Sequence, residues 1–517
     1  MAFTLTGSLI KTAATLKNIP EERRQRKLDP IEAQRKELRK LLHKAKGTAI
    51  GQAYHFDDIL KTPHLEEAFR QNVPVFDYKR MHDAWWHRIL KGEPNVTWPE
   101  KIRYFSMSSG TSETASKYIP FTPELKAAIT RASIRQFVST VRYHFPAHFY
   151  SRDMLMVGAS TALTYHPEGD FYAGYLSGIS ARRMPSWFEG FYKPGQRISS
   201  IEDWSERVNA IVASAPQWDV GAVVGLPSWV QLILEQIIEK YQLKTIHDLW
   251  PNLRVFLHSG MSFDSYEKSF QRIFGKPVYL VESYLASEGY IAYQVDLNRR
   301  VMQLLVDNGI YFEFIPFNDQ NFNENGDVVA HPETLTLSEV RTGVDYALLL
   351  STCAGSWRYL IGDTIRFLDT KACDIVITGR TKQFLNQSGE HLSQDDITRA
   401  VDTLAAELGV EIPEFTLSGI QNGTRMGHHW YLGCNAPIDA DTALRILDKR
   451  LAELSYDYAD ERGISLQELY IDVLPTQVFY DFMREKMGRW GDATKFPRIL
   501  KGDRYALWHE YVHAAQP

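Results

Sequence analysis

The sequence of 517 residues contains only three cysteines, Cys353, Cys373 and Cys434, and no two of them form a CxxC pair. This wide spacing argues against a disulfide framework or a zinc site, and it is typical of a reducing compartment. No apolar run approaches the ~20 residues needed to span a bilayer, and the first residues lack the apolar core of a cleavable signal. We therefore expect a cytoplasmic protein with no membrane partner.

The chain also lacks an excess of positive charge, since its formal net charge is −5. The basic runs near the N-terminus alternate with acidic residues, and Ile31, Leu38, Leu41 and Leu42 recur among them at helical spacing. This pattern predicts one charged amphipathic helix with a solvated face, so we expect no nucleic-acid partner. A hydrophobic content of 44% is that of an ordinary globular protein.

An alternation of helices and strands fills most of the sequence. Strand-like stretches at 153–160, 220–226, 253–260 and 277–284 are separated by helical patterns such as 228–243. This spacing predicts mostly parallel sheets flanked by helices. Short alternating strands joined by Asn-Gly, Gly-Ser and Gly-Asp turns follow between residues 302 and 380. They predict a small antiparallel or β-barrel-like subdomain.

Beyond Arg380 the pattern restarts. A helix with Ser393 as N-cap and Gly409 as its stop is followed by strands near 414–421, 428–436 and 469–475. The prediction is an α/β protein with a large N-terminal domain, residues 1–378. A small, mobile α+β C-terminal domain, residues 379–517, follows it.

The stretch "SSGTS", residues 108–112, has the composition of a phosphate-binding loop. Backbone amides converge on phosphate where glycine permits a close approach, and hydroxyl groups add donors. It is not a Walker A motif, because Ala115 and Ser116 stand where that motif has glycine and lysine. A Ser/Thr-rich turn without a ligand is an equally good interpretation of this stretch alone.

Three further segments occur after this loop in a fixed order: "ESYLASEGY" (282–290), "WRYLIGDTIRF" (357–367) and "TGRTKQFLNQSGE" (378–390). That order resembles the adenylate-forming, or acyl-adenylating, superfamily. With "GLPSW" (225–229) and "TKFPRIL" (494–500), the closer resemblance is to the plant auxin-responsive acyl-acid amido synthetases and their bacterial relatives. The resemblance extends from about residue 100 to the C-terminus.

The resemblance implies an ATP-dependent ligase that uses Mg²⁺. Such an enzyme converts a small carboxylic acid into an acyl-adenylate and transfers the acyl group to an amine, with an amino acid as the expected acceptor. A thiol acceptor, as in acyl-CoA synthetases and loaders of carrier proteins, is an alternative, and so is a degenerate binding protein without catalysis. Pocket shape, and therefore the identity of the acid and the acceptor, depends on side chains outside these motifs.

The resemblance also implies roles for individual residues. The phosphates would be held by Ser108, Ser109, Gly110, Thr111, Ser112 and Lys117. Glu288 would bind Mg²⁺ and take part in catalysis, Tyr284 would lie against the adenine, and Ser287 would lie near the α-phosphate. Asp363 would accept the ribose hydroxyls, Arg380 would begin the hinge, and Lys495 would enter the site during adenylation.

Each assignment has a purely structural alternative. Glu288 could be a carboxylate at the start of a helix, Asp363 a residue of a tight Gly-Asp turn, and Lys495 a solvated surface residue. The chain also departs from the family pattern at Glu113, Ala286 and His391. These departures leave open the alternative of a degenerate, weakly active enzyme. For the acid pocket, the sequence indicates residues 171–180 and 225–229 and the helix at 123–142, where Arg131 or Arg135 would hold a charged group of the substrate.

Overall fold

The computed structural model describes residues 2–108, 117–181, 189–259, 263, 266–323, 326–382, 384–385, 392–422, 425–455, 458–459, 462, 466–487 and 496–514. In this part of the chain, no helix has the length and apolar character that crossing a bilayer requires. All three cysteines are buried as free thiols.

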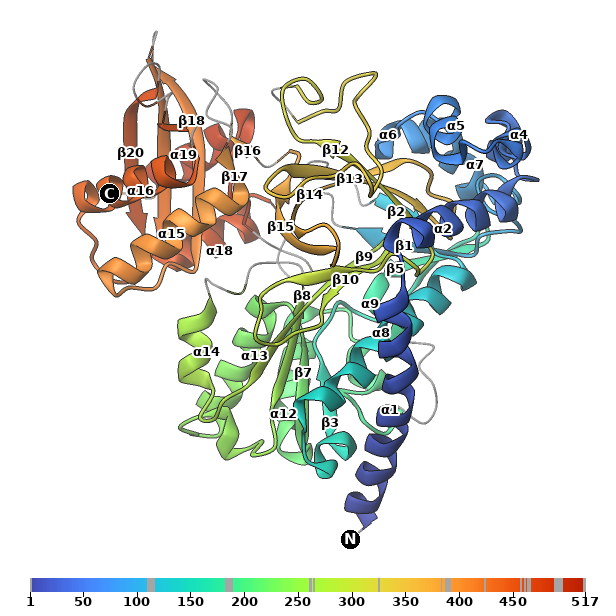
Figure 1. The fold of residues 1–517 in the computed structure, drawn as a ribbon. Coiled ribbons are helices and arrows are strands. Elements are labelled where there is room, and N and C mark those ends of the chain that lie inside the picture. The colour runs from blue at the N-terminus through green and yellow to red at the C-terminus, as the bar shows by residue number, and fades with distance from the viewer. Residues whose placement is uncertain are drawn as a thin grey trace.

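A mixed sheet of 11 strands forms the centre of the molecule (Figure 1). Its parallel part consists of β6 (Tyr192–Lys193), β3 (Asp153–Met156), β7 (Val220–Gly225), β8 (Val255–Ser259) and β9 (Tyr279–Ala286). The antiparallel part continues with β10 (Gly289–Gln294), β11 (Met302–Leu304), β15 (Asp374–Arg380), β14 (Tyr359–Asp369), β13 (Asp345–Thr352) and β12 (Ile310–Pro316).

The sequence predicted both strand patterns, but the two parts belong to one sheet. β9 and β10 pair as a hairpin, so the chain passes directly from the parallel to the antiparallel part. In the described pairings β12 and β6 are the two edges of the sheet, and a closed barrel is therefore not confirmed.

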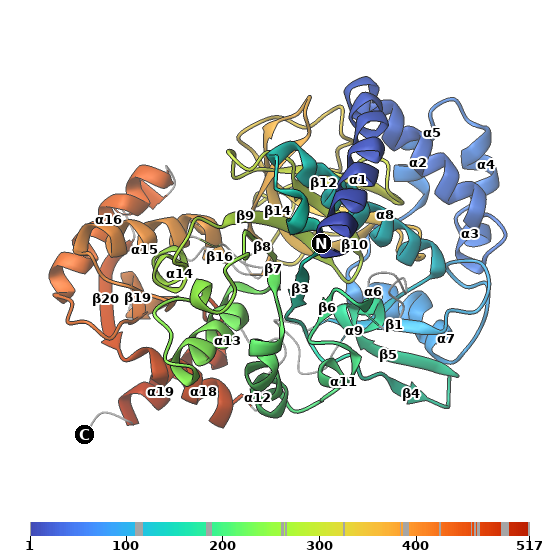
Figure 2. The same cartoon turned by 90° about the horizontal axis from the view of Figure 1, so that it is seen from below.

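Helices cover both faces of the parallel part (Figure 2). On one face, α12 (Trp204–Ser214), α13 (Pro227–Lys240) and α14 (Glu267–Ile273) pack against Val223 and Phe256. The opposite face carries α1 (Ala2–Lys27), α8 (Pro123–Ser139) and the 3-10 helices η2 (Thr140–Tyr143) and η3 (Ala147–Ser151). Burial on both faces explains why these strands are almost continuously apolar.

The N-terminal segment forms two helices where the sequence predicted one. α1 ends at Lys27, and α2 (Pro30–Ala45) begins after Asp29, whose carboxylate accepts hydrogen bonds from the amides of Ile31 and Glu32. An Asp-Pro pair is a strong helix start, because the aspartate caps the first turn and the proline fits its first position.

Short helices follow along the edge of the antiparallel part. They are α3 (Ala49–Ala53), α4 (Phe56–Lys61), α5 (Leu65–Asn72), α6 (Tyr78–Met81), the π-helical turn η1 (His82–Trp86) and α7 (His87–Leu90). The remaining short helices of the large part are α9 (Leu176–Ala181), α11 (Gln196–Ser199), η4 (Ala215–Gln217) and η5 (Ile246–Asp248).

A second, smaller sheet has the order β2-β1-β5-β4. It contains β1 (Tyr104–Ser108), β2 (Lys117–Pro120), β4 (Thr164–His166) and β5 (Phe171–Tyr175). β1 and β2 are antiparallel neighbours, with Ser108 opposite Lys117. The two strands therefore bracket the Ser/Thr-rich segment that the sequence singled out.

The C-terminal part has its own three-stranded sheet, β18 (Glu414–Asn422), β19 (Arg425–Gly433) and β20 (Leu466–Leu474). Its helices are α15 (Gln394–Leu408), α16 (Ala440–Leu454), α18 (Thr476–Glu485) and α19 (Gly502–Ala514), and β16 (Phe384–Leu385) pairs with β17 (Leu392–Ser393). Ser393 caps α15, and Gly409 ends it in the left-handed conformation, as predicted. Figure 1 shows this part beside the main sheet, reached after β15.

Candidate functional site

Ser287 and Glu288 form the two-residue turn of the β9–β10 hairpin, in which Ala286 pairs with Gly289. Gly289 has φ +155°, and a Cβ atom there would approach the Ile310 side chain to 2.7 Å. Glycine is therefore favoured by the backbone conformation, whereas a Cβ atom would require only the flexible end of the Ile310 side chain to shift. The interpretation of Glu288 as a helix-start carboxylate is wrong, because no helix begins at this turn.

Asp363 lies within the long strand β14, opposite Arg380 on β15. The prediction that Gly362 and Asp363 form a tight turn between two strands is wrong. Instead, the register against β13 shifts between Ala347 and Leu349, and Gly362 has φ +90°. A strand irregularity with glycine at positive φ is typical of a bulge, which redirects the neighbouring side chain.

Asp363 is held from two sides. The Tyr284 hydroxyl donates to Asp363 Oδ2 at 2.5 Å, and Arg380 Nε donates to Oδ1 at 2.7 Å. The charge of Asp363 raises the pKa of the Arg380 guanidinium. Burial, followed by the Asp363 charge, raises the pKa of the Tyr284 phenol well above its usual value, so the phenol stays a donor. The three side chains form a preorganised anionic acceptor with a cation beside it.

The smaller sheet meets this site through a pair of serines. Ser106 on β1 donates from its hydroxyl to the Ser287 hydroxyl at 3.0 Å. Ser106 is not among the predicted site residues, although it lies two residues before Ser108 on a strand and therefore shares its face. The strand that leads into the Ser/Thr-rich segment thus contacts the turn that carries Glu288.

Glu288 is 6% exposed, and burial raises the pKa of its carboxyl group to about 7. The charge of Asp363 adds to this rise, whereas Lys117 and Arg380 oppose it. Lys117 and Arg380 act on the Glu288 carboxylate through their charge alone: within the described residues, no side chain forms a hydrogen bond or a close ion pair with it. A buried carboxylate with this deficit of positive charge fits a divalent cation, which would stabilise its ionised form.

Tyr359, which is not among the predicted site residues, also lies near Glu288. Its side chain is 2% exposed, and burial together with the Glu288 charge raises the pKa of its phenol. Of the predicted site residues, the structure therefore brings together Lys117, Tyr284, Ser287, Glu288, Asp363 and Arg380.

The other predicted residues lie outside the described part of the chain. They are Ser109, Gly110, Thr111, Ser112 and Lys495, and of Ser108 only the backbone is described. Glu113 and His391, two of the departures from the family pattern, also lie outside it.

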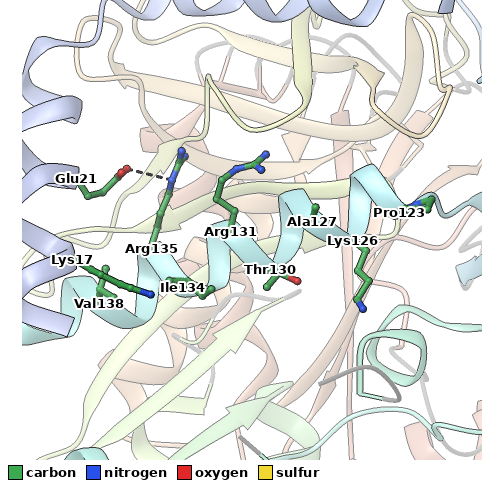
Figure 3. Close-up of a pocket in the computed structure, with 10 residues that line it drawn as sticks. All are labelled: Lys17, Glu21, Pro123, Lys126, Ala127, Thr130, Arg131, Ile134, Arg135 and Val138. Carbon is green, nitrogen blue, oxygen red and sulfur yellow. Dashed lines mark ion pairs between the residues drawn. The ribbon is translucent and has the colours of Figure 1, made fainter. Parts of the chain in front are cut away.

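Arg131 and Arg135 have structural contacts away from this site. Arg135 pairs with Asp307 at 2.8 Å and with Glu21 of α1 at 3.2 Å, and Arg131 Nε donates to Asn308 at 3.1 Å. Both line a groove of about 720 Å³ between α1 and α8 (Figure 3). None of the residues gathered around Glu288 lines that groove.

Three family models match successive parts of the chain. The GH3 family N-terminal domain matches residues 21–215, the central domain residues 303–380, and the C-terminal domain residues 395–503. Together they span most of the chain in the order that the family has.

Curated relatives match nearly the whole chain. An indole-3-acetic acid-amido synthetase, GH3.10 of Arabidopsis thaliana, is 25% identical over 84% of this chain and 85% of its own. A jasmonoyl–L-amino acid synthetase, JAR4 of Nicotiana attenuata, is 23% identical over 91% of both.

Solved structures share the fold. GH3.15 acyl acid amido synthetase superposes with a TM-score of 0.75 over 93% of both chains, at 16% identity. A 2-hydroxyisobutyryl-CoA ligase in the postadenylation state reaches 0.55 over 93% of this chain and 92% of that one, at 14% identity.

Proposed function

This chain belongs to the GH3 family, and from that premise we propose that it is an ATP-dependent acyl-acid amido synthetase. It activates a small carboxylic acid as an acyl-adenylate and transfers the acyl group to an amine, with an amino acid as the expected acceptor. The observation that carries the proposal is that the β9–β10 turn, with Ser287 and Glu288, lies close to Asp363 of β14 and contacts β1, the strand that leads into the Ser/Thr-rich segment.

The first step joins the acid to AMP. A carboxylate oxygen attacks the α-phosphorus of ATP, the bond to the bridging oxygen of the β-phosphate breaks, and pyrophosphate leaves with the electron pair. In the second step the amine nitrogen attacks the acyl carbon, the bond to the AMP oxygen breaks, and the amine gives up a proton. The first step crowds negative charge at one point, so electrostatic stabilisation carries most of the catalysis.

Asp363 fits the ribose role by its remaining acceptor capacity. A carboxylate offers about four lone-pair sites, and Tyr284 and Arg380 occupy one on each oxygen. We assign Tyr284 to the wall beside the adenine and Ser287 to the α-phosphate. Residues 108–112 and Lys117 would hold the phosphates, and Glu288 would be a protein ligand of Mg²⁺, which would supply positive charge there.

We further propose that residues 379–517 form a mobile lid on a large domain of residues 1–378. Lys495 enters the site for adenylation, and the hinge begins at Arg380. Several of the lid's described contacts with the large part are exposed and polar: Lys268 Nζ donates to the carbonyls of Ala405 and Val410, both at 3.1 Å, and Arg272 pairs with Glu411. Contacts of this kind separate at low cost. The buried free thiols support a cytoplasmic location.

The test is carboxylate-dependent exchange of radiolabelled pyrophosphate into ATP, over aromatic, indolic and aliphatic acids. We expect exchange with at least one acid, only with Mg²⁺ present. Single-turnover product analysis with amino acids or CoA then identifies the acceptor: an amide supports the proposal, whereas a thioester moves the chain to the CoA ligases. An absence of exchange across the whole panel would mean a binding protein without catalysis.

A further inference from the structure

Tyr78, the first residue of α6, contacts both residues that open β2. Its phenolic oxygen accepts a hydrogen bond from the Tyr118 amide at 3.0 Å. The Lys117 ammonium nitrogen lies 5.3 Å from the centroid of the Tyr78 ring, within the range of a cation–π contact. Tyr78 therefore contacts the start of β2 in two ways, through a hydrogen bond with the Tyr118 backbone and a cation–π contact with the Lys117 side chain.

This hydrogen bond pairs a backbone amide on the open edge of the smaller sheet. Among the strands that the structure describes, β2 is an edge strand that pairs only with β1, and Tyr118 lies opposite Met107. The Tyr118 amide points away from β1, so a neighbouring strand does not pair with it. Because an unpaired backbone donor in a partly buried position is costly, the Tyr78 hydroxyl fixes where β2 begins.

Tyr78 is itself held firmly. Its ring stacks on His82 with centroids 6.0 Å apart and meets Trp86 edge-on at 5.8 Å. Trp86 in turn packs against Tyr359 at 5.3 Å. Two residues earlier, Phe76 exchanges backbone hydrogen bonds with β14: its amide donates to the Arg358 carbonyl at 2.9 Å, and its carbonyl accepts from the Leu360 amide at 2.7 Å. The segment that carries Tyr78 is thus bonded to the strand that carries Asp363.

We propose that Tyr78 is a positioning residue that directs the Lys117 ammonium group toward the phosphates of MgATP. The inference rests on the proposed function and goes beyond it, because Tyr78 acts through Lys117 and touches no substrate. The aromatic face confines the ammonium group on one side, and Lys117 is close enough to Glu288 for the two charges to interact. A lysine with a flexible four-carbon stem gains most from such confinement.

The experiment separates the two contacts of Tyr78 in the full chain. Tyr78→Phe keeps the aromatic face and removes the acceptor, whereas Tyr78→Leu removes both. We expect the dissociation constant of MgATP, measured by calorimetry, to rise less than about 3-fold in Tyr78→Phe. In Tyr78→Leu it should rise about 5- to 30-fold, the loss expected for a partly desolvated cation–π contact. Should Tyr78→Leu fail to fold, Tyr78→Met removes the same face with a more adaptable side chain.

A double-mutant cycle with Lys117→Ala distinguishes positioning from packing. If Tyr78 acts through Lys117, Tyr78→Leu should weaken MgATP binding no further in the Lys117→Ala background. An equal loss in both backgrounds would overturn the proposal. Tyr143 is the matched control, because its hydroxyl also accepts a backbone hydrogen bond, from Leu297 at 3.3 Å. Tyr143→Leu should leave the MgATP dissociation constant unchanged.

Hydrogen exchange provides a readout that needs no nucleotide. The Tyr118 amide should exchange at least about 10-fold faster in Tyr78→Phe and Tyr78→Leu than in the parent protein, while amides of β18 stay unchanged. Unchanged exchange at Tyr118 would overturn the anchoring of β2 by Tyr78. If the parent protein binds no MgATP, the proposed function fails, and this exchange measurement still decides whether Tyr78 fixes the start of β2.

Discussion

Tyr284 on β9 and Asp363 on β14 are joined by a hydrogen bond of 2.5 Å across the central sheet, from the phenol to the carboxylate. Four strands separate β9 from β14 in the chain, and three lie between them in the sheet. The bond therefore ties the parallel part of the sheet to the antiparallel part. Arg380 completes the arrangement from β15, the last strand before the C-terminal part.

Replacing Asp363 by Asn should weaken ATP binding by at least about 10-fold. The amide has nearly the same shape, but its NH₂ group cannot accept a hydrogen bond from Tyr284 or Arg380, and hydrogen bonds to charged groups contribute about 1.5–3 kcal/mol. Calorimetric titration with MgATP measures the change. Tyr284→Phe, which removes a single donor, should have the smaller effect; equal binding by Asp363→Asn and the parent would contradict the ribose role.

Lys495→Ala should lower the rate of pyrophosphate exchange by at least about 100-fold. A lysine that neutralises the carboxylate and the α-phosphate during adenylation acts mainly in the transition state, so kcat falls while the KM for ATP changes little. Lys486→Ala, at an exposed position, is the control for loss of a lysine. A rise in KM without a fall in kcat would show that Lys495 binds ATP and does not assist the reaction.

Local signals predicted the helices well. Ser393 and Gly409 define the two ends of α15 in both sequence and structure. Capping interactions involve residues within one helical turn, so helix ends can be predicted from the local sequence without knowledge of the tertiary fold. The break between α1 and α2 at Asp29 was equally local and was missed because charged residues at helical spacing continue across it.

The site could be predicted by residue type but not by its connections. "GD" in the sequence suggested a turn, and only pairing with β13 and β15 shows that Asp363 lies in an irregular strand. Likewise, the contact between Ser106 and Ser287 joins residues 181 positions apart. Such contacts depend on which strands become neighbours, and periodicity along the chain contains no information about that.

Replacing Arg358 by Met should lower the free energy of unfolding by about 3–5 kcal/mol. Arg358 is buried, its Nε pairs with Glu313 at 2.9 Å, and its Nη1 donates to the carbonyls of both Arg70 and Val73. Its loss leaves Glu313, 1% exposed, without its hydrogen-bonded counter-charge and with only the charge of Arg70 acting on it, which is the costly way to break a buried pair.

Denaturant unfolding measures this change. Arg142→Met removes a partly exposed pair with Glu22 and should cost less than about 1 kcal/mol. The double variant Arg358→Met with Glu313→Met should recover part of the loss, because it removes both charges. A loss for Arg358→Met no greater than that for Arg142→Met would mean that the buried pair contributes little.

Asp395→Asn should stabilise the protein at pH 8 and leave it unchanged at pH 4. Burial raises the pKa of the Asp395 carboxyl group, in the first turn of α15, to about 6, and the charges of Asp396 and Asp345 add to the rise. A folded-state pKa above the unfolded value near 4 means that the neutral carboxyl favours the fold. That contribution is complete below about pH 4 and is lost as the pH rises through 6.

The expected gain for Asp395→Asn above pH 7 is about 1–3 kcal/mol, since the side chain is 31% exposed and solvent reduces the full effect. Thermal unfolding between pH 4 and pH 8 measures it. Asp441→Asn removes an exposed carboxylate from the first turn of α16, so it controls for the helix dipole. A gain for Asp395→Asn that does not grow between pH 4 and pH 7 would mean that Asp395 does not carry this titration. Because Asp345 of β13 is one of the charges that raise the pKa of Asp395, a gain confined to high pH would indicate repulsion between two carboxylates where the lid adjoins the large domain.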